Sequence, residues 1–177
     1  HDPRWTAQER MTHRAFPTTA AILAGGMGTR LRSAVGDRQK VVAEVEGRPF
    51  LFHLLDNLEE QGIRRVVLCT GHLAETVRRA VAQHPGDLEI SWSEEPERLG
   101  TAGAIGFARP SLPEGEDIFV LNGDSLCDVD LGGLHAWHQK WEAAATLTLT
   151  HVPDTARYGG VELDDARVTA FVEKGRV

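Results

Sequence analysis

A glycine-rich turn near the N-terminus is the segment best suited to chemistry in this sequence of 177 residues. The segment combines small apolar, glycine and polar residues: Leu23, Ala24, Gly25, Gly26, Gly28, Thr29 and Arg30. Glycines let the backbone approach a ligand closely and turn its N–H groups toward anionic oxygens. A hydroxyl and a guanidinium add further donors for the same oxygens. The pattern predicts a triphosphate-binding loop, with a plain strand-to-helix turn as the alternative.

Two well-known phosphate motifs do not fit this turn. The Walker pattern requires a lysine followed by serine or threonine directly after its last glycine, but Gly28 is followed by Thr29 and Arg30. The dinucleotide fingerprint requires a glycine or alanine where this chain has Leu31. A dinucleotide-dependent oxidoreductase is therefore disfavoured.

Two later segments carry further candidate groups. Asn122 and Asp124 follow an apolar run at 118–121, where the carboxylate can meet a hard cation such as Mg²⁺. Glu94 begins a polar stretch that leads to Gly100 and Thr101, whose small size allows a flat base to lie against the backbone. The alternatives are a simple turn at Asp124 and a helix cap at Thr101.

These segments follow predicted strands. Apolar runs predict strands at 19–23, 65–70, 88–93 and 118–121, and helical spacing predicts helices at 49–61, 74–83 and 101–108. Alternating strands and helices predict a three-layer α/β/α sandwich with a Rossmann-like, mainly parallel sheet in one domain. Ligands bind beyond the carboxyl ends of the strands in such sheets, so the candidate groups are expected to meet there.

The turn from Leu23 to Leu31 resembles the signature of the sugar-nucleotidyltransferases, in which a Pro-Lys pair follows some residues later. Lys40 matches that lysine, and Gln39 replaces the usual proline. The Leu-Gly-Thr-Ala-Gly stretch at 99–103 and the Asn-Gly-Asp stretch at 122–124 also match. The resemblance implies the nucleotide-diphospho-sugar transferase fold, a nucleobase beside Gly100 and Thr101, and Mg²⁺ on Asp124.

The resemblance extends toward the C-terminus and implies a reaction. Gly159, Glu173 and Lys174 match residues that bind the sugar 1-phosphate. A phosphate oxygen of that sugar would attack the α-phosphorus of a nucleoside triphosphate and release pyrophosphate. The resemblance assigns catalytic charges to four residues: Arg30, Lys40, Asp124 and Lys174. It favours GTP, and favours D-glycero-D-manno-heptose 1-phosphate over mannose 1-phosphate as the sugar substrate.

Composition agrees with an ordinary soluble globular protein. The chain is 41% hydrophobic and 25% charged, with a formal net charge of −7. No basic block favours nucleic acid, and no apolar run approaches the ~20 residues that span a bilayer. Without a secretory pattern, the cytoplasm is the expected location. Residues 1–17 are expected to be a flexible leader or cloning remnant, and 18–177 a transferase domain that lacks its C-terminal part.

Three expectations remain. Cys69 and Cys127 are predicted to be buried free thiols, and His135 and His138 to be surface residues rather than zinc ligands. A homo-oligomer is left open. Because the family normally continues past the position of Val177 with a second metal ligand, a non-catalytic nucleotide-binding or sugar-nucleotide-binding regulatory module on the same fold is the alternative function.

Overall fold

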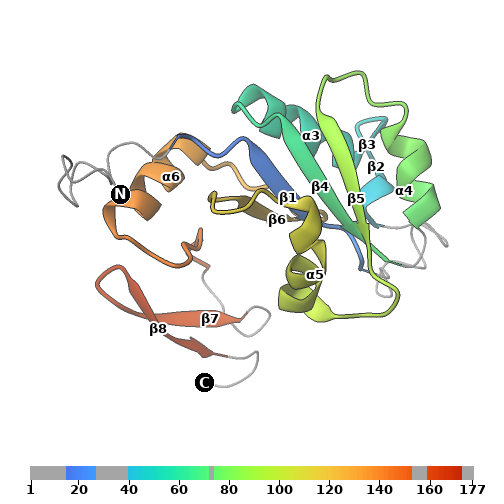
Figure 1. The fold of residues 1–177 in the computed structure, drawn as a ribbon. Coiled ribbons are helices and arrows are strands. Elements are labelled where there is room, and N and C mark those ends of the chain that lie inside the picture. The colour runs from blue at the N-terminus through green and yellow to red at the C-terminus, as the bar shows by residue number, and fades with distance from the viewer. Residues whose placement is uncertain (1–14, 27–39, 72–73, 153–158, 173–177) are drawn as a thin grey trace. The chain divides into compact units, whose positions relative to one another are not determined.

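A computed structural model describes residues 15–26, 40–71, 74–152 and 159–172 of the chain (Figure 1). The chain divides into two compact units, the first ending at Ala144 and the second beginning at Ala145. Among the described helices, none is long and apolar enough to cross a membrane.

The first unit is built on a four-stranded sheet. Its strands are β1 (Thr19–Leu23), β4 (Arg65–Thr70), β5 (Glu89–Glu94) and β6 (Phe119–Asn122), in the order β5-β4-β1-β6. All neighbouring strands are parallel, and Leu23 at the end of β1 lies between Cys69 and Asn122. The carboxyl ends of the strands therefore meet at one edge of the sheet, as the sequence predicted.

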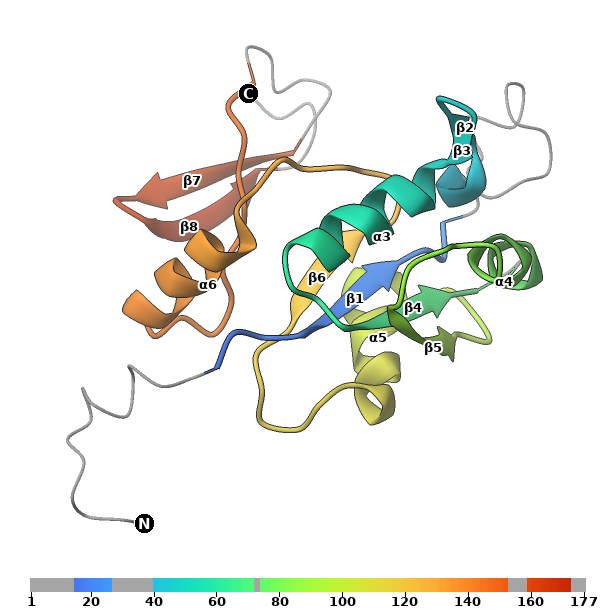
Figure 2. The same cartoon turned by 90° about the horizontal axis from the view of Figure 1, so that it is seen from above.

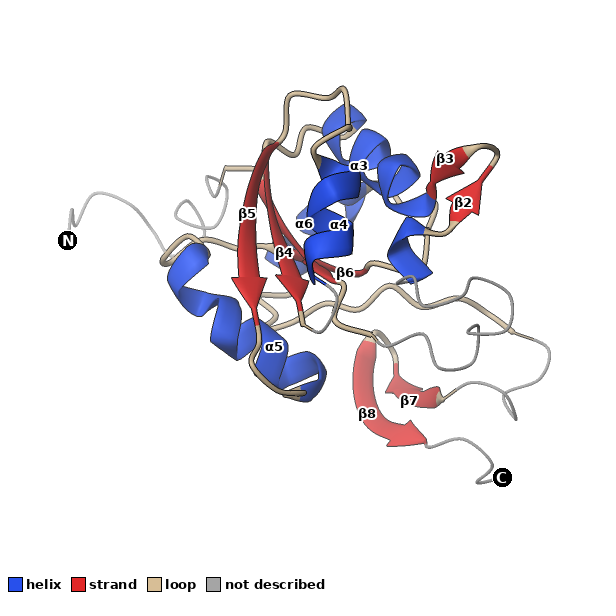
Figure 3. Cartoon of the chain, turned by 90° about the vertical axis from the view of Figure 1, so that its right-hand side faces the viewer, coloured by secondary structure: helices blue, strands red, loops and turns tan. Residues whose placement is uncertain are grey.

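Helices cover both faces of this sheet (Figures 2 and 3). One face packs against α3 (Phe50–Glu60), α4 (Ala74–Val81) and α6 (Leu131–Lys140). The other face packs against α5 (Gly100–Ala108) and the following short helix η2 (Arg109–Ser111). The predicted α/β/α sandwich with a parallel sheet is confirmed.

Alternation along the strands sends side chains to two cores. Ile22 and Leu68 join the larger core with Leu55 of α3, and all three are fully buried. Ala21 and Val67, the neighbours of those strand residues, join Ala108 of α5 in the smaller core. Each of these strands therefore contributes side chains to both cores, one on each face of the sheet.

Short elements complete the fold and were not predicted. The helix η1 (Lys40–Val42) precedes the small hairpin of β2 (Glu44–Val45) and β3 (Arg48–Pro49). Glu46 and Gly47 turn this hairpin with φ values of 52° and 76°. The second unit contains the antiparallel hairpin of β7 (Gly160–Asp164) and β8 (Arg167–Val172).

Two predictions about individual side chains are wrong. Cys69 is a buried free thiol as expected, but Cys127 is exposed because it lies in the loop between β6 and α6. His135 and His138 are not freely exposed, since both face Asp117, with Nε2 to carboxylate oxygen distances of 3.6 and 3.8 Å. Their side chains are only 11% and 19% exposed.

The expected leader ends in residues that contact the core. The ring centroid of Phe16 lies 5.6 Å from that of Phe119 and 6.0 Å from that of His135, which it meets edge-on.

A side chain caps the start of α6. The Asp130 carboxylate accepts a hydrogen bond from Gly132 N at 2.9 Å. Asp130 is thus the N-cap of α6.

Candidate functional site

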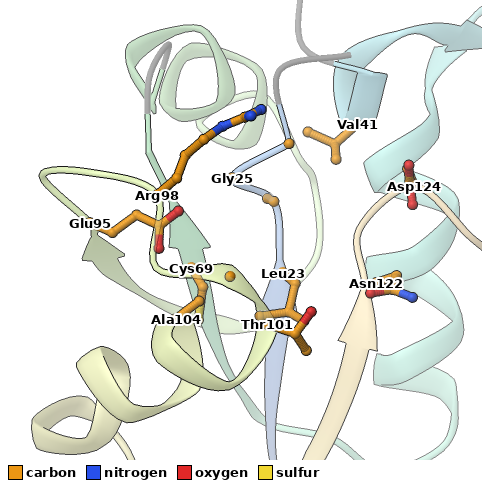
Figure 4. Close-up of a pocket in the computed structure, with 13 residues that line it drawn as sticks. Leu23, Gly25, Val41, Cys69, Glu95, Arg98, Thr101, Ala104, Asn122 and Asp124 are labelled. Atoms are coloured by element: carbon orange, nitrogen blue, oxygen red, sulfur yellow. The ribbon is translucent and has the colours of Figure 1, made fainter. Parts of the chain in front are cut away.

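A pocket of about 390 Å³ opens at the carboxyl ends of the strands in the first unit. The ends of β1, β4 and β6, the turn before α5, the first turns of α5 and the helix η1 line it. It brings together these residues predicted from sequence: Leu23, Ala24, Gly25, Gly26, Gly100, Thr101, Asn122 and Asp124. Figure 4 shows that side chains from elements far apart in the sequence surround one space.

Two backbone hydrogen bonds extend the sheet into loops that form the pocket. Ala24 N donates to Cys69 O at 2.8 Å, directly after β1. Glu95 N donates to Thr70 O at 2.8 Å, directly after β5. Each bond continues the parallel pairing by one residue, so the first loop residues inherit the rigidity of the sheet.

Gly123 brings the third loop against β1. Its N–H donates to Leu23 O at 2.9 Å. A Cβ at this position would lie 3.0 Å from Leu23 O and 3.0 Å from Cγ1 of Val41. Glycine permits this close approach without displacing Leu23 or Val41, and the turn places Asp124 at the edge of the pocket.

Asn122 and Asp124 lie on the β6 side of the pocket, across from Glu95 on the β5 side (Figure 4). Asp124 is exposed, and Ser125 Oγ donates to its Oδ1 at 3.4 Å. Its carboxylate can therefore reach a cation or water that enters the pocket.

Glu95 is a pocket residue that sequence reasoning missed in favour of its neighbour Glu94. Glu94 does not line the pocket, and its carboxylate pairs with Arg78 at 3.3 Å. Glu95 Oε1 lies 2.9 Å from the point where a Cβ on Gly25 would stand, and Oε2 accepts a hydrogen bond from Leu99 N at 3.4 Å. The carboxylate thus lies against the glycine turn and the start of α5.

Cys69, Val41, Ala104 and Arg98 are further lining residues without a predicted role. Burial raises the pKa of the Cys69 thiol, and the nearby negative charge of Glu95 raises it further. The thiol therefore stays protonated near neutral pH and serves the pocket as a small apolar surface. The sequence predicts that Cys69 lies on β4. It does not predict that Cys69 lines the pocket, because that depends on where α5 packs.

Thr101 does not cap the helix, contrary to the alternative derived from sequence. The N-cap is Leu99, which makes no side-chain capping bond, and Gly100 follows with a φ of 71°. Thr101 instead lies within the first turn of α5, exposed and lining the pocket. Its hydroxyl is available to a ligand.

The remaining predicted residues cannot be placed in the pocket. Lys40 begins η1, but its side chain lies outside the described part of the chain. Gly159 precedes β7 in the second unit. Outside the described residues lie Gly28, Thr29, Arg30, Glu173 and Lys174.

Comparison with known proteins identifies the family. The family described as nucleotidyl transferase matches residues 19–176. This chain belongs to the nucleotidyl transferase family. The prediction of a nucleotidyltransferase is thereby confirmed.

The chain is 40% identical over 156 residues to D-glycero-alpha-D-manno-heptose 1-phosphate guanylyltransferase of Aneurinibacillus thermoaerophilus, covering 88% of this chain and 67% of that protein. It is 37% identical to the mannose-1-phosphate guanylyltransferase catalytic subunit beta of Danio rerio, covering 89% of this chain. The chain spans less than half of that relative, 45% of its length.

Solved structures share the fold. HddC from Yersinia pseudotuberculosis, in a crystal structure with GMP-PN, has 33% sequence identity and a TM-score of 0.79, covering 90% of this chain and 71% of that chain. UDP-glucose pyrophosphorylase from Acinetobacter baumannii has a TM-score of 0.75 at 20% identity, covering 89% of this chain and 67% of that chain. That second likeness concerns the fold alone.

Proposed function

We propose that the protein transfers a guanylyl group from GTP to a sugar 1-phosphate and releases pyrophosphate. The observation that carries this proposal is the pocket at the strand ends, where a glycine turn, the start of α5 and Asp124 face one space of about 390 Å³. This volume is typical of a small-molecule site, for which the range is about 300–1,000 Å³. Membership of the nucleotidyl transferase family supports the reaction, and the pocket supports this place for the nucleotide.

Glu95 supports guanine as the base. Guanine presents two adjacent donors, N1–H and the N2 amino group, and an ionised carboxylate offers two acceptors. Adenine lacks this pair of donors. Glu95 lines the pocket beside Gly25 and the start of α5, where the base is expected to lie. The guanylyltransferase names of the relatives and the GMP-PN bound to HddC point the same way.

Asp124 is suited to Mg²⁺. Among the described residues, no group of three or more His, Cys, Asp or Glu could hold a metal ion. A single carboxylate fits Mg²⁺, which keeps several waters and binds phosphate oxygens of the substrate. When bound, Mg²⁺ would neutralise negative charge on the phosphates.

The chain's own groups would position the reactants. The Gly25–Gly26 turn would bind phosphate oxygens through its backbone, while Arg30 and Lys40 would hold the triphosphate. The attacking phosphate is already ionised, so orientation and charge neutralisation account for catalysis without a general base. Gly159, Glu173 and Lys174 would hold the sugar 1-phosphate, with Lys174 on its phosphate.

Heptose 1-phosphate is the favoured sugar and mannose 1-phosphate the second. The support is the 40% identity to the heptose 1-phosphate enzyme, against 37% for the mannose 1-phosphate enzyme. The assay therefore includes both sugars.

The test is pyrophosphate release with Mg²⁺, crossing the four nucleoside triphosphates with heptose, mannose and glucose 1-phosphates. Release that requires both GTP and a sugar 1-phosphate would support the transfer, and the Asp124→Asn variant should lose it. GTP binding without release for any sugar would instead support the non-catalytic binding module.

The base is tested by comparing GTP with ITP, which lacks the N2 amino group. We expect GTP to bind about tenfold more tightly, the effect of one hydrogen bond to a charged group. The Glu95→Gln variant should reduce this preference, because an amide replaces one acceptor with a donor. An unchanged preference would remove Glu95 from base recognition.

A further inference from the structure

Arg98 is the charged pocket residue that the proposed function leaves without a task. Three charged side chains line the pocket among the described residues, and Arg98 faces two carboxylates, Glu95 and Asp124. A nucleoside triphosphate is strongly anionic, so a site for it needs cations near the phosphates. Within the described part of the pocket lining, Arg98 supplies that positive charge.

The turn before α5 holds Arg98 at the rim. The turn is fixed at its start by the bond of Glu95 N to Thr70 O, 2.8 Å, and is closed by the bond of Leu99 N to Glu95 Oε2, 3.4 Å. The Arg98 side chain extends from the Glu95 side of the pocket across Gly25 toward Val41 (Figure 4). In this view the guanidinium end of the side chain points toward the glycine turn and Val41, and Arg98 is exposed to solvent.

The guanidinium is available for a ligand. With the described residues it forms no ion pair or side-chain hydrogen bond, whereas Arg78 on α4 is engaged by Glu94 at 3.3 Å and by the Trp92 ring. A planar guanidinium presents a fork of N–H donors that matches two phosphate oxygens. Arg98 is thus a preplaced phosphate-binding group beside the glycine turn.

We propose that Arg98 binds the β- and γ-phosphates of the nucleotide and so holds the pyrophosphate that leaves. This rests on the proposed function, which places the base beside Glu95 and the phosphates along the Gly25–Gly26 turn. Arg98 reaches that turn from the side opposite Asp124. Arg98 would then hold the phosphate chain directly from one wall of the pocket, and Asp124 would do so from the opposite wall through Mg²⁺.

The experiment measures the binding of GTP, GDP and GMP by calorimetry, with Mg²⁺ and at constant ionic strength. Arg98→Gln should weaken GTP binding by about 10- to 100-fold, as expected for losing charge-assisted hydrogen bonds. GMP, which lacks the β- and γ-phosphates, should bind as before. Arg98→Lys should fall between, because an ammonium keeps the charge but loses the fork.

Arg109→Gln is the matched control, since Arg109 is exposed at the other end of α5 and does not line the pocket. It should leave all three affinities unchanged. An equal loss of GTP and GMP affinity in Arg98→Gln would overturn the proposal in favour of a contact with the base or ribose. Unchanged GTP affinity would overturn it in favour of a solvated side chain.

These outcomes can be told apart from failure of the proposed function. If GTP binds more tightly than GMP and this preference depends on Arg98, the inference holds even when no pyrophosphate is released. If release requires GTP and a sugar 1-phosphate but does not depend on Arg98, the transfer stands and the inference falls. If the protein binds none of the three nucleotides, both fall.

Discussion

The two faces of the parallel sheet differ in the size of the side chains that they bury. On the α3 face, Ile22, Leu68 and Leu55 are large and fully buried. On the α5 face, the corresponding core consists of Ala21, Val67, Cys69 and Ala108. The same strands supply both faces, so the difference comes from alternate residues of one sequence.

This difference separates stability from binding. Large buried side chains remove more apolar area from water and contribute more to folding. Small residues on the α5 face instead leave room at the strand ends, where Cys69 and Ala104 line the pocket. We infer that the α3 face provides most of the stability and the α5 face forms the binding surface.

The largest expected effect comes from Leu55→Ala on the α3 face. Leu55 is fully buried against the sheet, so its truncation should lower the free energy of unfolding by about 3 kcal/mol. Urea unfolding measures the loss. Phe107→Ala on α5 is the control, because Phe107 is 45% exposed and should cost far less. Equal losses for the two variants would contradict the division between the faces.

Gly123→Ala should have the next largest effect, because Gly123 matters both for stability and for the binding surface. The added methyl group would lie 3.0 Å from Leu23 O and from Cγ1 of Val41. The resulting strain should cost about 1–3 kcal/mol of stability, and displacement of Asp124 should lower pyrophosphate release as well. Urea unfolding and the release assay measure the two effects. Wild-type values in both would show that the turn can move without cost.

Ala104→Leu tests the α5 face directly. A larger side chain should project into the pocket and weaken GTP binding by about tenfold, which corresponds to about 1.4 kcal/mol. The melting temperature should change little, because the pocket accepts the added volume. Ala102→Leu is the control, since Ala102 is exposed on the same helix and does not line the pocket. Equal weakening in both variants would argue for a general distortion of α5.

The sequence predicted the main elements on both faces closely. The strands expected at 19–23 and 65–70 coincide with β1 and β4, and the helix expected at 49–61 is α3, Phe50–Glu60. Strong apolar periodicity defines these elements, and Gly62, with a φ of 94°, follows the helix end. The two-residue strands β2 and β3 are too short to show an alternating pattern. A bulge between Glu162 and Leu163 interrupts the alternation of β7, so the sequence did not predict these strands.

The pocket was predictable only where a residue type is tied to a backbone position. Gly25 and Asp124 are such residues, because a close approach and a cation each require a particular side chain. Glu95 and Arg98 lie in a polar turn, where the sequence does not indicate which of several charges faces inward. That choice follows from the sheet bond of Glu95 N to Thr70 O, which depends on tertiary register.

A smaller, pH-dependent effect is expected on the α3 face. Burial raises the pKa of Asp56, but hydrogen bonds from His84 and Arg48, both at 2.8 Å, outweigh it and hold the pKa below its usual 3.8. The stabilisation is therefore present above pH 3.8 and is lost as the pH falls through the lower folded value. The loss should not exceed about 1 kcal/mol, because the carboxylate is partly exposed.

The measurement is the free energy of unfolding in urea between pH 5 and pH 2. Asp56→Asn should be less stable than the wild type at pH 5, and the difference should shrink on acidification. A constant difference would show that Asp56 contributes by packing rather than by charge.

The smallest expected effect is a gain in stability on the α5 face. Gly106 lies in the last turn of α5, and a Cβ there would meet nothing within 4 Å. Gly106→Ala should raise the free energy of unfolding by about 0.5–1 kcal/mol, because alanine loses less backbone entropy than glycine in a helix. Gly103→Ala is the contrasting variant, since its Cβ would lie 2.6 Å from the Leu99 Cβ and disturb the turn that carries Arg98. If Gly106→Ala is stabilised and binds GTP normally, while Gly103→Ala loses affinity, the glycines of α5 serve two purposes. One lies on the solvent side and can be replaced, and the other permits the close turn on which the binding surface depends.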